Sequence, residues 1–136
     1  MDFITAVRTC LSKYATFRGR APRSEFWWFY LFIVVIDIIL GFFVGSETMV
    51  RIREGGFDAM SVAFATNRAL MVQGLIHLAL LLPMLAVAVR RLHDVGRTGW
   101  WLLLGLIFPF FGMLILIWWW VQPSEPRPNA HGMPLG

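Results

Sequence analysis

The chain has 136 residues, 58% of them hydrophobic, with seven tryptophans and a formal net charge of +4. A single soluble domain of this length could not bury so much apolar surface, so we expect an all-α integral membrane protein with lipid as its solvent. The arginines lie next to apolar segments, which suits anionic lipid headgroups. This placement argues against nucleic acid as the partner, because a nucleic-acid-binding surface needs its basic residues on a soluble face.

The sequence also lacks the usual signatures of catalysis. Cys10 is the single cysteine, so an intramolecular disulfide and a cysteine-based metal cluster are excluded. No Walker loop, HExxH motif or nucleophile elbow occurs, and we expect no metal, no cofactor and no enzymatic activity. Residues 1–25 contain no apolar core of a cleavable signal peptide, so the first apolar segment is expected to direct insertion and stay in the membrane.

Three apolar segments are each long enough to cross a bilayer, which takes about 20 helical residues. They form an expected membrane domain over 26–121, with spans at about 26–45, 70–89 and 100–121. Pro109 and Gly112 lie near the middle of the third segment. Dividing it there would leave halves of about ten residues, so one kinked span is expected.

All seven tryptophans fall at the ends of these predicted spans, as in the aromatic belts of membrane proteins. One surface would carry Trp27, Trp28, Trp100 and Trp101, and the other would carry Trp118, Trp119 and Trp120. This distribution favours three crossings.

The segments outside the spans are predicted to differ from each other. Residues 1–25 combine a basic cytoplasmic segment with an amphipathic helix over 2–15, in which apolar residues recur at helical spacing at Phe3, Val7, Leu11 and Tyr14. This helix either lies flat in the headgroup region or packs against the membrane domain. Four prolines make residues 122–136 an irregular tail.

Basic residues indicate the orientation. With a cytoplasmic N-terminus, eight of the 12 lysines and arginines lie inside and four outside, and three crossings then place the C-terminus outside. The polar connection 46–68 would be external. In it, Asp58 is a candidate N-cap for a helix that runs straight into the second span.

Two ionisable residues interrupt the spans at about the same depth, because antiparallel neighbours bring Asp37 and His77 level with each other. An acid there costs at least about 2.5 kcal/mol, so it should face protein, water or a partner. The two residues either form a buried pair, with proton handling as an extension, or face different neighbours. Gly41 and Gly45 form a small-xxx-small pair that would let a second helix approach, as in a homo-oligomer.

Two arginine-rich stretches carry the strongest local signal, and the orientation places both at one headgroup-level surface. The first holds Arg18, Arg20, Arg23 and Glu25, and the second holds Arg90, Arg91, His93, Asp94 and Arg97. Six arginines there form a candidate anion site for lipid phosphate. Alternatively, they only obey the positive-inside rule and pair with the acids.

The second stretch also reads as a capped turn between two helices. Gly96 fits a helix C-terminal cap and Thr98 fits an N-cap. Arg91 and Asp94, three residues apart, can form an ion pair. His93 and Asp94 point about 100° apart on a helix, so adjacency alone does not make them a catalytic dyad.

These stretches resemble a known family. The motifs Phe17-Arg18-Gly19-Arg20 through Arg23-Ser24-Glu25-Phe26-Trp27, and Arg90-Arg91-Leu92-His93-Asp94 through Gly96-Arg97-Thr98-Gly99-Trp100-Trp101, are similar to the bacterial family called domain of unknown function 805. The tail, with Asn129, His131, Gly132 and Pro134, resembles that family's ending more loosely. The resemblance covers nearly the whole chain. It implies a small inner-membrane protein without an agreed activity, and it supplies no catalytic residues.

Together these observations favour a membrane-interaction or structural protein of the bacterial inner membrane. Its cytoplasmic arginine cluster would bind anionic lipid headgroups or the acidic segment of a membrane-protein partner. The alternative is a component of an oligomeric proton-coupled transporter that uses Asp37 and His77. A membrane enzyme acting through His93 and Asp94 is the weakest hypothesis.

Overall fold

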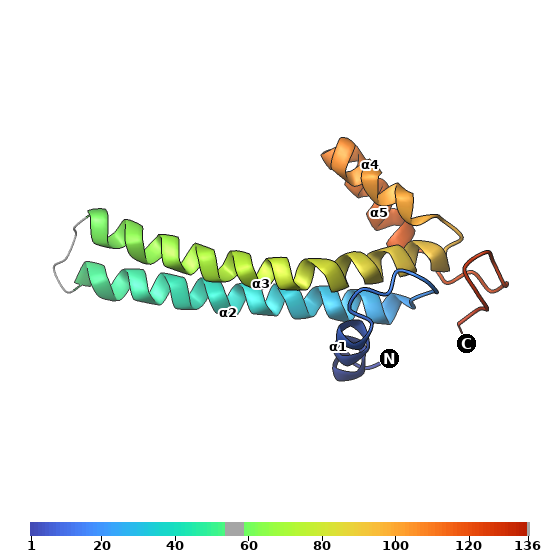
Figure 1. Ribbon diagram of the computed structural model, residues 1–136, viewed down its shortest axis with the longest axis horizontal. Coiled ribbons are helices and arrows are strands. Elements are labelled where there is room, and N and C mark those ends of the chain that lie inside the picture. Colours follow the sequence, from blue (N-terminus) through green and yellow to red (C-terminus); the bar gives the residue numbers. More distant parts are fainter. Residues whose placement is uncertain (54–58, 136) are drawn as a thin grey trace. The chain divides into compact units, whose positions relative to one another are not determined.

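The structure is a computed structural model that describes residues 1–53 and 59–135. Its elements are α1 (Phe3–Ser12), α2 (Arg23–Arg53), α3 (Ala59–Asp94), the short 3₁₀ helix η1 (Gly99–Trp101), α4 (Leu102–Ile107) and α5 (Pro109–Val121) (Figure 1). Within the described residues the only β pairing is an isolated bridge between Asn129 and Gly132. The predicted all-α class is confirmed.

The chain divides into two compact units, which are described separately. The terminal unit consists of residues 1–30 and 82–136, and the hairpin unit consists of residues 31–81. Both long helices contribute to both units: α2 begins in the terminal unit, and α3 ends in it.

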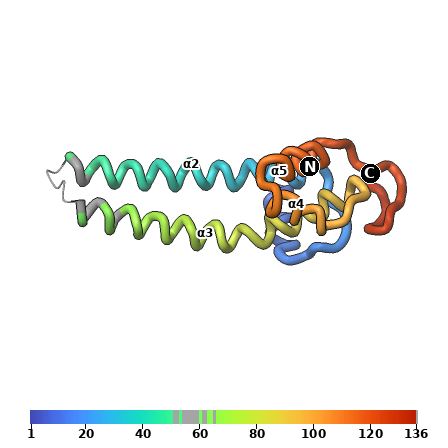
Figure 2. The backbone as a smooth tube through the Cα atoms, turned by 90° about the horizontal axis from the view of Figure 1, so that it is seen from above, coloured from blue at the N-terminus to red at the C-terminus, as the bar shows by residue number. Residues whose placement is uncertain are grey.

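In the hairpin unit, α2 and α3 run side by side in opposite directions (Figures 1 and 2). Their surface is apolar, with Ile38, Phe42 and Leu75 exposed by 66%, 74% and 66%. Among the residues that the structure describes, two helical segments are long and apolar enough to cross a membrane, namely Arg23–Val50 and Thr66–Asp94. They contain the predicted spans 26–45 and 70–89.

Both helices are longer than the predicted spans. α2 has 31 residues and α3 has 36, so much of the polar connection predicted over 46–68 is helical. No proline lies between residues 46 and 68 to stop either helix. The proposed N-cap Asp58 lies outside the described residues.

The segment predicted as one kinked third span is a hairpin of two short helices. α4 and α5 pack against each other (Figure 2). A Cβ on Gly112 would overlap the carbonyl oxygen of Leu104. In a straight helix these residues would be about 12 Å apart, so the chain reverses. The structure therefore does not contain the single helix that we predicted over 100–121.

The reversal has a local cause at Phe108 and Pro109. A residue that precedes proline avoids the helical conformation, and Phe108 has φ −122° and ψ 79°. Pro109 then occupies the first turn of α5, where its missing N–H is not needed. The proline ends one helix and begins another instead of kinking a single one.

The tryptophans are also placed differently from the prediction. All seven belong to the terminal unit, which contains Trp27, Trp28, Trp100, Trp101, Trp118, Trp119 and Trp120. Trp119 and Trp120 are 7% and 8% exposed, and the ring of Trp120 lies 4.7 Å from that of Phe26. Because the third segment turns back, its final tryptophans return to the unit that contains the first ones. The predicted second aromatic surface at these residues is wrong.

α1 packs into the same unit. It buries Ala6 and Cys10, and the ring of Phe3 contacts Trp28 edge-on at 5.9 Å. Leu11, which belongs to the predicted apolar stripe, is 42% exposed instead. Of the two arrangements considered for this helix, the structure has the packed one.

Candidate functional site

The centre of the terminal unit is a buried carboxylate held between two arginines. Nε of Arg20 donates to Oδ1 of Asp94 at 2.8 Å, and Nη1 of Arg91 donates to Oδ2. The side chains of Arg20 and Asp94 are 1% and 0% exposed. One acid thus joins the first arginine-rich motif to the second.

Arg20 also binds three backbone carbonyls. Its Nη2 donates to the carbonyl of Asp94 at 3.2 Å and to that of Glu125 at 2.5 Å, and its Nη1 donates to that of Arg127 at 3.0 Å. The Asp94 carbonyl is at the C-terminal end of α3, where cations are stabilised by the helix dipole. Arg20 therefore caps a helix and fastens the tail.

Arg91 caps the C-terminal end of α5 in a similar way. Its Nε donates to the carbonyl of Trp120 at 3.2 Å and its Nη2 donates to that of Gln122. These carbonyls lie at the C-terminal end of α5 and would otherwise lack partners. The ion pair between Arg91 and Asp94 has the three-residue spacing that we predicted.

A second ion pair lies at the start of α2. Nη1 of Arg90 donates to Oε1 of Glu25 at 2.6 Å, and both side chains are buried. Nε and Nη2 of Arg90 have no hydrogen-bond partner in the described part of the chain. The Cys10 thiol lies 3.7 Å from Oε1 of Glu25. Burial and this neighbouring carboxylate raise the pKa of Cys10 from 9.0 to about 12, so the thiol stays neutral.

The six arginines predicted as one anion site thus fall into two sets. Arg20, Arg90 and Arg91 are buried and partnered, whereas Arg18, Arg23 and Arg97 are exposed. In the described residues, none of the exposed three forms an ion pair with a carboxylate. The guanidinium of Arg97 lies 5.0 Å above the ring of Trp119, a cation–π contact.

His93 takes no part in the Asp94 network. Its Nδ1–H donates to the carbonyl of Gly19 at 3.1 Å, and its ring stacks on that of His131 at 3.7 Å. Gly19 has φ +88°, a conformation that favours glycine and turns the carbonyl toward the imidazole. A catalytic dyad of His93 with Asp94 is therefore absent from this arrangement.

The predicted caps of the turn are present in part. Gly96 has φ +72° and follows the end of α3, as expected of a C-terminal cap. Thr98 is the N-cap of η1, but its side chain makes no capping hydrogen bond. The turn is therefore closed mainly by backbone bonds, including Arg97 N to the carbonyl of Leu92 at 2.9 Å.

The tail contributes to this network in a way that the sequence did not predict. Besides the carbonyls bound by Arg20, the N–H of Glu125 donates to the carbonyl of Asp94 at 3.0 Å, and Nδ2 of Asn129 donates to that of His93 at 2.9 Å. The tail and Arg20 are therefore in direct contact, whereas the three predicted crossings would separate them. The one available signal was the proline-rich composition, which keeps carbonyls free of helix bonds.

Asp37 and His77, which the sequence predicts as intramembrane polar residues, lie together in the hairpin unit. Nε2 of His77 is 2.7 Å from Oδ1 of Asp37, and the side chains are 43% and 38% exposed. Antiparallel packing brings them level, as the sequence argument expects. Within the described residues no group of three or more metal-binding side chains occurs.

Comparison with known proteins finds a matching family of unknown function and similar inner membrane proteins. Residues 14–133 match the family described as "Protein of unknown function (DUF805)". The inner membrane protein YhaH of Escherichia coli K12 is 35% identical over 122 residues, which cover 90% of this chain and 88% of that relative. The inner membrane protein YhaI of the same strain is 34% identical, covering 90% and 87%. No solved structure matches the chain.

Proposed function

The chain belongs to the DUF805 family of proteins of unknown function, and from this premise we propose that it is a structural inner-membrane protein that binds anionic lipid headgroups at its cytoplasmic face. α2 and α3 cross the membrane in this proposal. The terminal unit lies at the cytoplasmic headgroup level, with both termini inside.

The charge distribution supports this topology. With the tail on the same side as the N-terminus, Arg127 joins the inside set, and nine of the 12 lysines and arginines lie in the cytoplasm. Only Arg51, Arg53 and Arg68 remain outside. Two crossings thus satisfy the positive-inside rule better than the three first predicted.

The α4–α5 hairpin fits the same picture as a re-entrant element. Its helices have 6 and 13 residues, too few to cross a bilayer, yet Leu106, Phe110 and Phe111 are 76%, 70% and 70% exposed. Such apolar surface is stable in the lipid of one leaflet, where helices satisfy their own backbone groups. We assign the hairpin to the cytoplasmic leaflet.

The observation that supports the proposed function is that three arginines of the two motifs are buried and three are exposed. The buried three are bound by acids and carbonyls, which leaves Arg18, Arg23 and Arg97 without a carboxylate partner in the described residues. An exposed guanidinium at headgroup level binds phosphate through charge-assisted hydrogen bonds. The contact of Arg97 with Trp119 holds one of these cations beside an aromatic ring of the kind found at membrane interfaces.

Native mass spectrometry of the purified protein with added phosphatidylglycerol tests this function. Each of Arg18→Gln, Arg23→Gln and Arg97→Gln should weaken binding about fivefold, because a basic residue near an anionic surface contributes about 1 kcal/mol. Because the lipid is the only added component, phosphatidylglycerol that stays bound to the protein reports headgroup binding and not binding of an acidic protein partner.

Arg53→Gln is the matched control, since Arg53 is also exposed but belongs to neither arginine-rich motif. It should leave phosphatidylglycerol binding unchanged. An equal loss in the control, or unchanged binding in a variant that combines Arg18→Gln, Arg23→Gln and Arg97→Gln, would show that the exposed arginines do not form a headgroup site.

A second candidate function is that of an oligomeric proton-coupled transporter, supported by the 2.7 Å contact between Asp37 and His77. An ionisable pair in an apolar hairpin is a typical feature of a proton relay. Proton flux in liposomes should then fall in Asp37→Asn. Flux equal to that of protein-free liposomes, for the wild type and for the variant, removes this candidate.

A further inference from the structure

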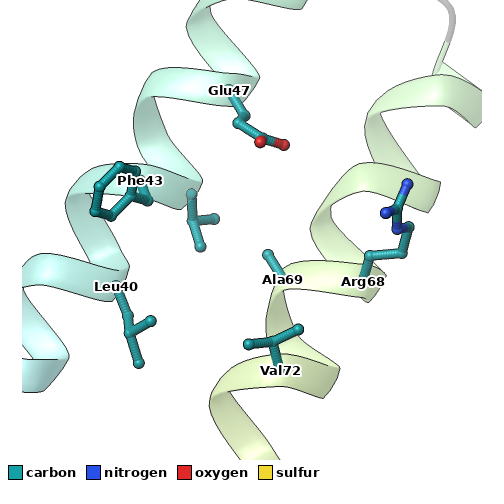
Figure 3. A pocket seen from close by; sticks show the side chains of 7 residues that line it. Leu40, Phe43, Glu47, Arg68, Ala69 and Val72 are labelled. Atoms are coloured by element: carbon teal, nitrogen blue, oxygen red, sulfur yellow. The ribbon is translucent and has the colours of Figure 1, made fainter.

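The hairpin unit contains a pocket between its two helices. The pocket has a volume of about 330 Å³ and is lined by Leu40, Phe43, Val44, Glu47, Arg68, Ala69 and Val72. Figure 3 shows Ala69 and Val72 of α3 directed toward α2, and the Glu47 carboxylate directed toward α3. Five of the seven lining side chains are apolar, and the two charged ones have opposite signs.

The two charged residues lie at the same end of the pocket (Figure 3). Both side chains are exposed, and in the described part of the chain they form no ion pair with each other or with another residue. Glu47 follows the apolar run that ends near Gly45, and Arg68 precedes the one that begins at Leu70. Both charges therefore fall where apolar helix meets the polar headgroup region.

The pocket continues from this level toward the apolar interior. Leu40 is seven residues before Glu47, about 10 Å deeper along α2. Beyond Leu40, farther from Glu47, Nε2 of His77 lies 2.7 Å from Oδ1 of Asp37 and connects the two helices. The Asp37–His77 contact therefore closes the apolar end of the pocket. At the opposite end the pocket opens beside Glu47 and Arg68, and the side chains between the two ends are hydrocarbon.

We propose that this pocket binds one phospholipid whose headgroup carries both a phosphate and a primary ammonium. Arg68 binds the phosphate, Glu47 accepts hydrogen bonds from the ammonium, and an acyl chain lies along Leu40, Val44 and Val72. The residues differ entirely from the cytoplasmic arginines, so this site is independent of the proposed headgroup function.

The charges select this class of lipid over the other common ones. An anionic headgroup without an amine would leave Glu47 facing negative charge, which is unfavourable at short range. A quaternary ammonium has no N–H to donate to the carboxylate, whereas a primary ammonium has three. Glu47 and Arg68 together therefore discriminate phosphatidylethanolamine from phosphatidylglycerol and from phosphatidylcholine.

Native mass spectrometry of the full chain, with each of these three lipids added at equal concentration, tests the site. The wild type should bind phosphatidylethanolamine about tenfold more tightly than phosphatidylcholine, the usual effect of one charge-assisted hydrogen bond. Glu47→Gln should abolish this preference. Arg68→Gln should weaken binding of all three lipids at this site, and Arg68→Lys should keep most of it.

Arg53→Gln removes an exposed arginine of α2 that does not line the pocket, and it should change none of these values. The triple variant of Arg18, Arg23 and Arg97 should also keep the phosphatidylethanolamine preference, which separates this proposal from the cytoplasmic one. Equal binding of phosphatidylethanolamine and phosphatidylcholine by the wild type overturns the site. A dimer that becomes monomeric in Arg68→Gln also overturns it, because a second copy would then occupy the pocket.

Discussion

The two units of the chain use charged residues in opposite ways. Every buried residue in the described part of the chain belongs to the terminal unit, including five charged ones: Arg20, Glu25, Arg90, Arg91 and Asp94. The hairpin unit buries none of its described side chains, and the ion pair found among its described residues, Asp37 with His77, is about 40% exposed.

This difference shows which interactions determine each unit. Burying an ion costs several kcal/mol unless it is paired and hydrogen-bonded, so the terminal unit holds together only while its charges keep their partners. The hairpin unit directs apolar side chains outward, and lipid would cover them in the topology proposed above. We expect substitutions that change charge or volume to have large effects in the terminal unit and small ones in the hairpin unit.

The largest effect is expected for Asp94→Asn. The change removes the negative charge shared by Arg20 and Arg91 and leaves two buried guanidinium groups without a counterion. Loss of one partner of a buried ion pair typically costs 3–5 kcal/mol, roughly, which is a large share of the stability of a small domain. Thermal unfolding in detergent, followed by circular dichroism, measures the loss.

Glu125→Gln is the control for that experiment. It makes the same chemical change on a half-buried acid whose side chain accepts one hydrogen bond, from Asn129 at 2.8 Å. Its melting temperature should stay close to the wild-type value. Equal destabilisation by the two substitutions would contradict a central role for Asp94.

The second largest effect is expected for the reactivity of the Cys10 thiol, which reports whether the terminal unit is closed. Because burial and Glu25 raise the pKa of this thiol from 9.0 to about 12, the reactive thiolate should be about a thousandfold scarcer than for an ordinary cysteine at pH 8. Maleimide labelling of the folded protein should be correspondingly slow. Asp94→Asn should accelerate it by opening the unit.

The same shift gives a pH dependence. The folded thiol holds its proton more tightly than the unfolded one, so its contribution to stability is complete below about pH 9 and is lost as the pH rises toward 12. Thr16→Cys in a Cys10→Ser background provides an exposed thiol for comparison. Labelling of wild-type Cys10 at the rate of that thiol at pH 8 would show that the site is open.

Gly112→Ala should have an intermediate effect. Its Cβ would overlap the backbone oxygen of Leu104, so α4 and α5 would have to separate. Overpacking of this kind costs about 1–3 kcal/mol. Gly74→Ala in the hairpin unit is the control, since a Cβ there meets nothing within 4 Å. A smaller loss of thermal stability in Gly112→Ala than in Gly74→Ala would contradict the close α4–α5 hairpin.

The two units also differ in how far they could be predicted from the sequence, because one depends on local spacing and the other on distant contacts. The two long helices and the level placement of Asp37 and His77 depend on local periodicity and on rise per residue, so both could be predicted, although the helices extend beyond the predicted spans. The pairing of Arg91 with Asp94 also follows from local spacing. These features need no knowledge of distant parts of the chain.

The terminal unit depends on distant contacts and could be predicted only in part. Arg18 and Arg20 are the same residue type two positions apart, and only Arg20 is buried, by its contacts with Asp94 and with the tail carbonyls. Backbone acceptors such as those of Glu125 and Arg127 have no signature in the sequence. The third segment has the length of a span, and a length criterion does not detect that Phe108 and Pro109 reverse the chain.

The smallest effect is expected at the polar pair of the hairpin unit. Hydrogen bonds between membrane helices contribute about 0.6 kcal/mol on average, because the separated helices also find partners for their polar groups. A double-mutant cycle of Asp37→Asn and His77→Gln, measured by unfolding in bicelles, should give a coupling energy of this size. The corresponding cycle at Glu25 and Arg90, which are both buried, should give a much larger one. A coupling of several kcal/mol at Asp37 and His77 would contradict the distinction between the units. It would mean that another protein chain covers the pair in the membrane, since two helices that leave it about 40% exposed do not bury it on their own.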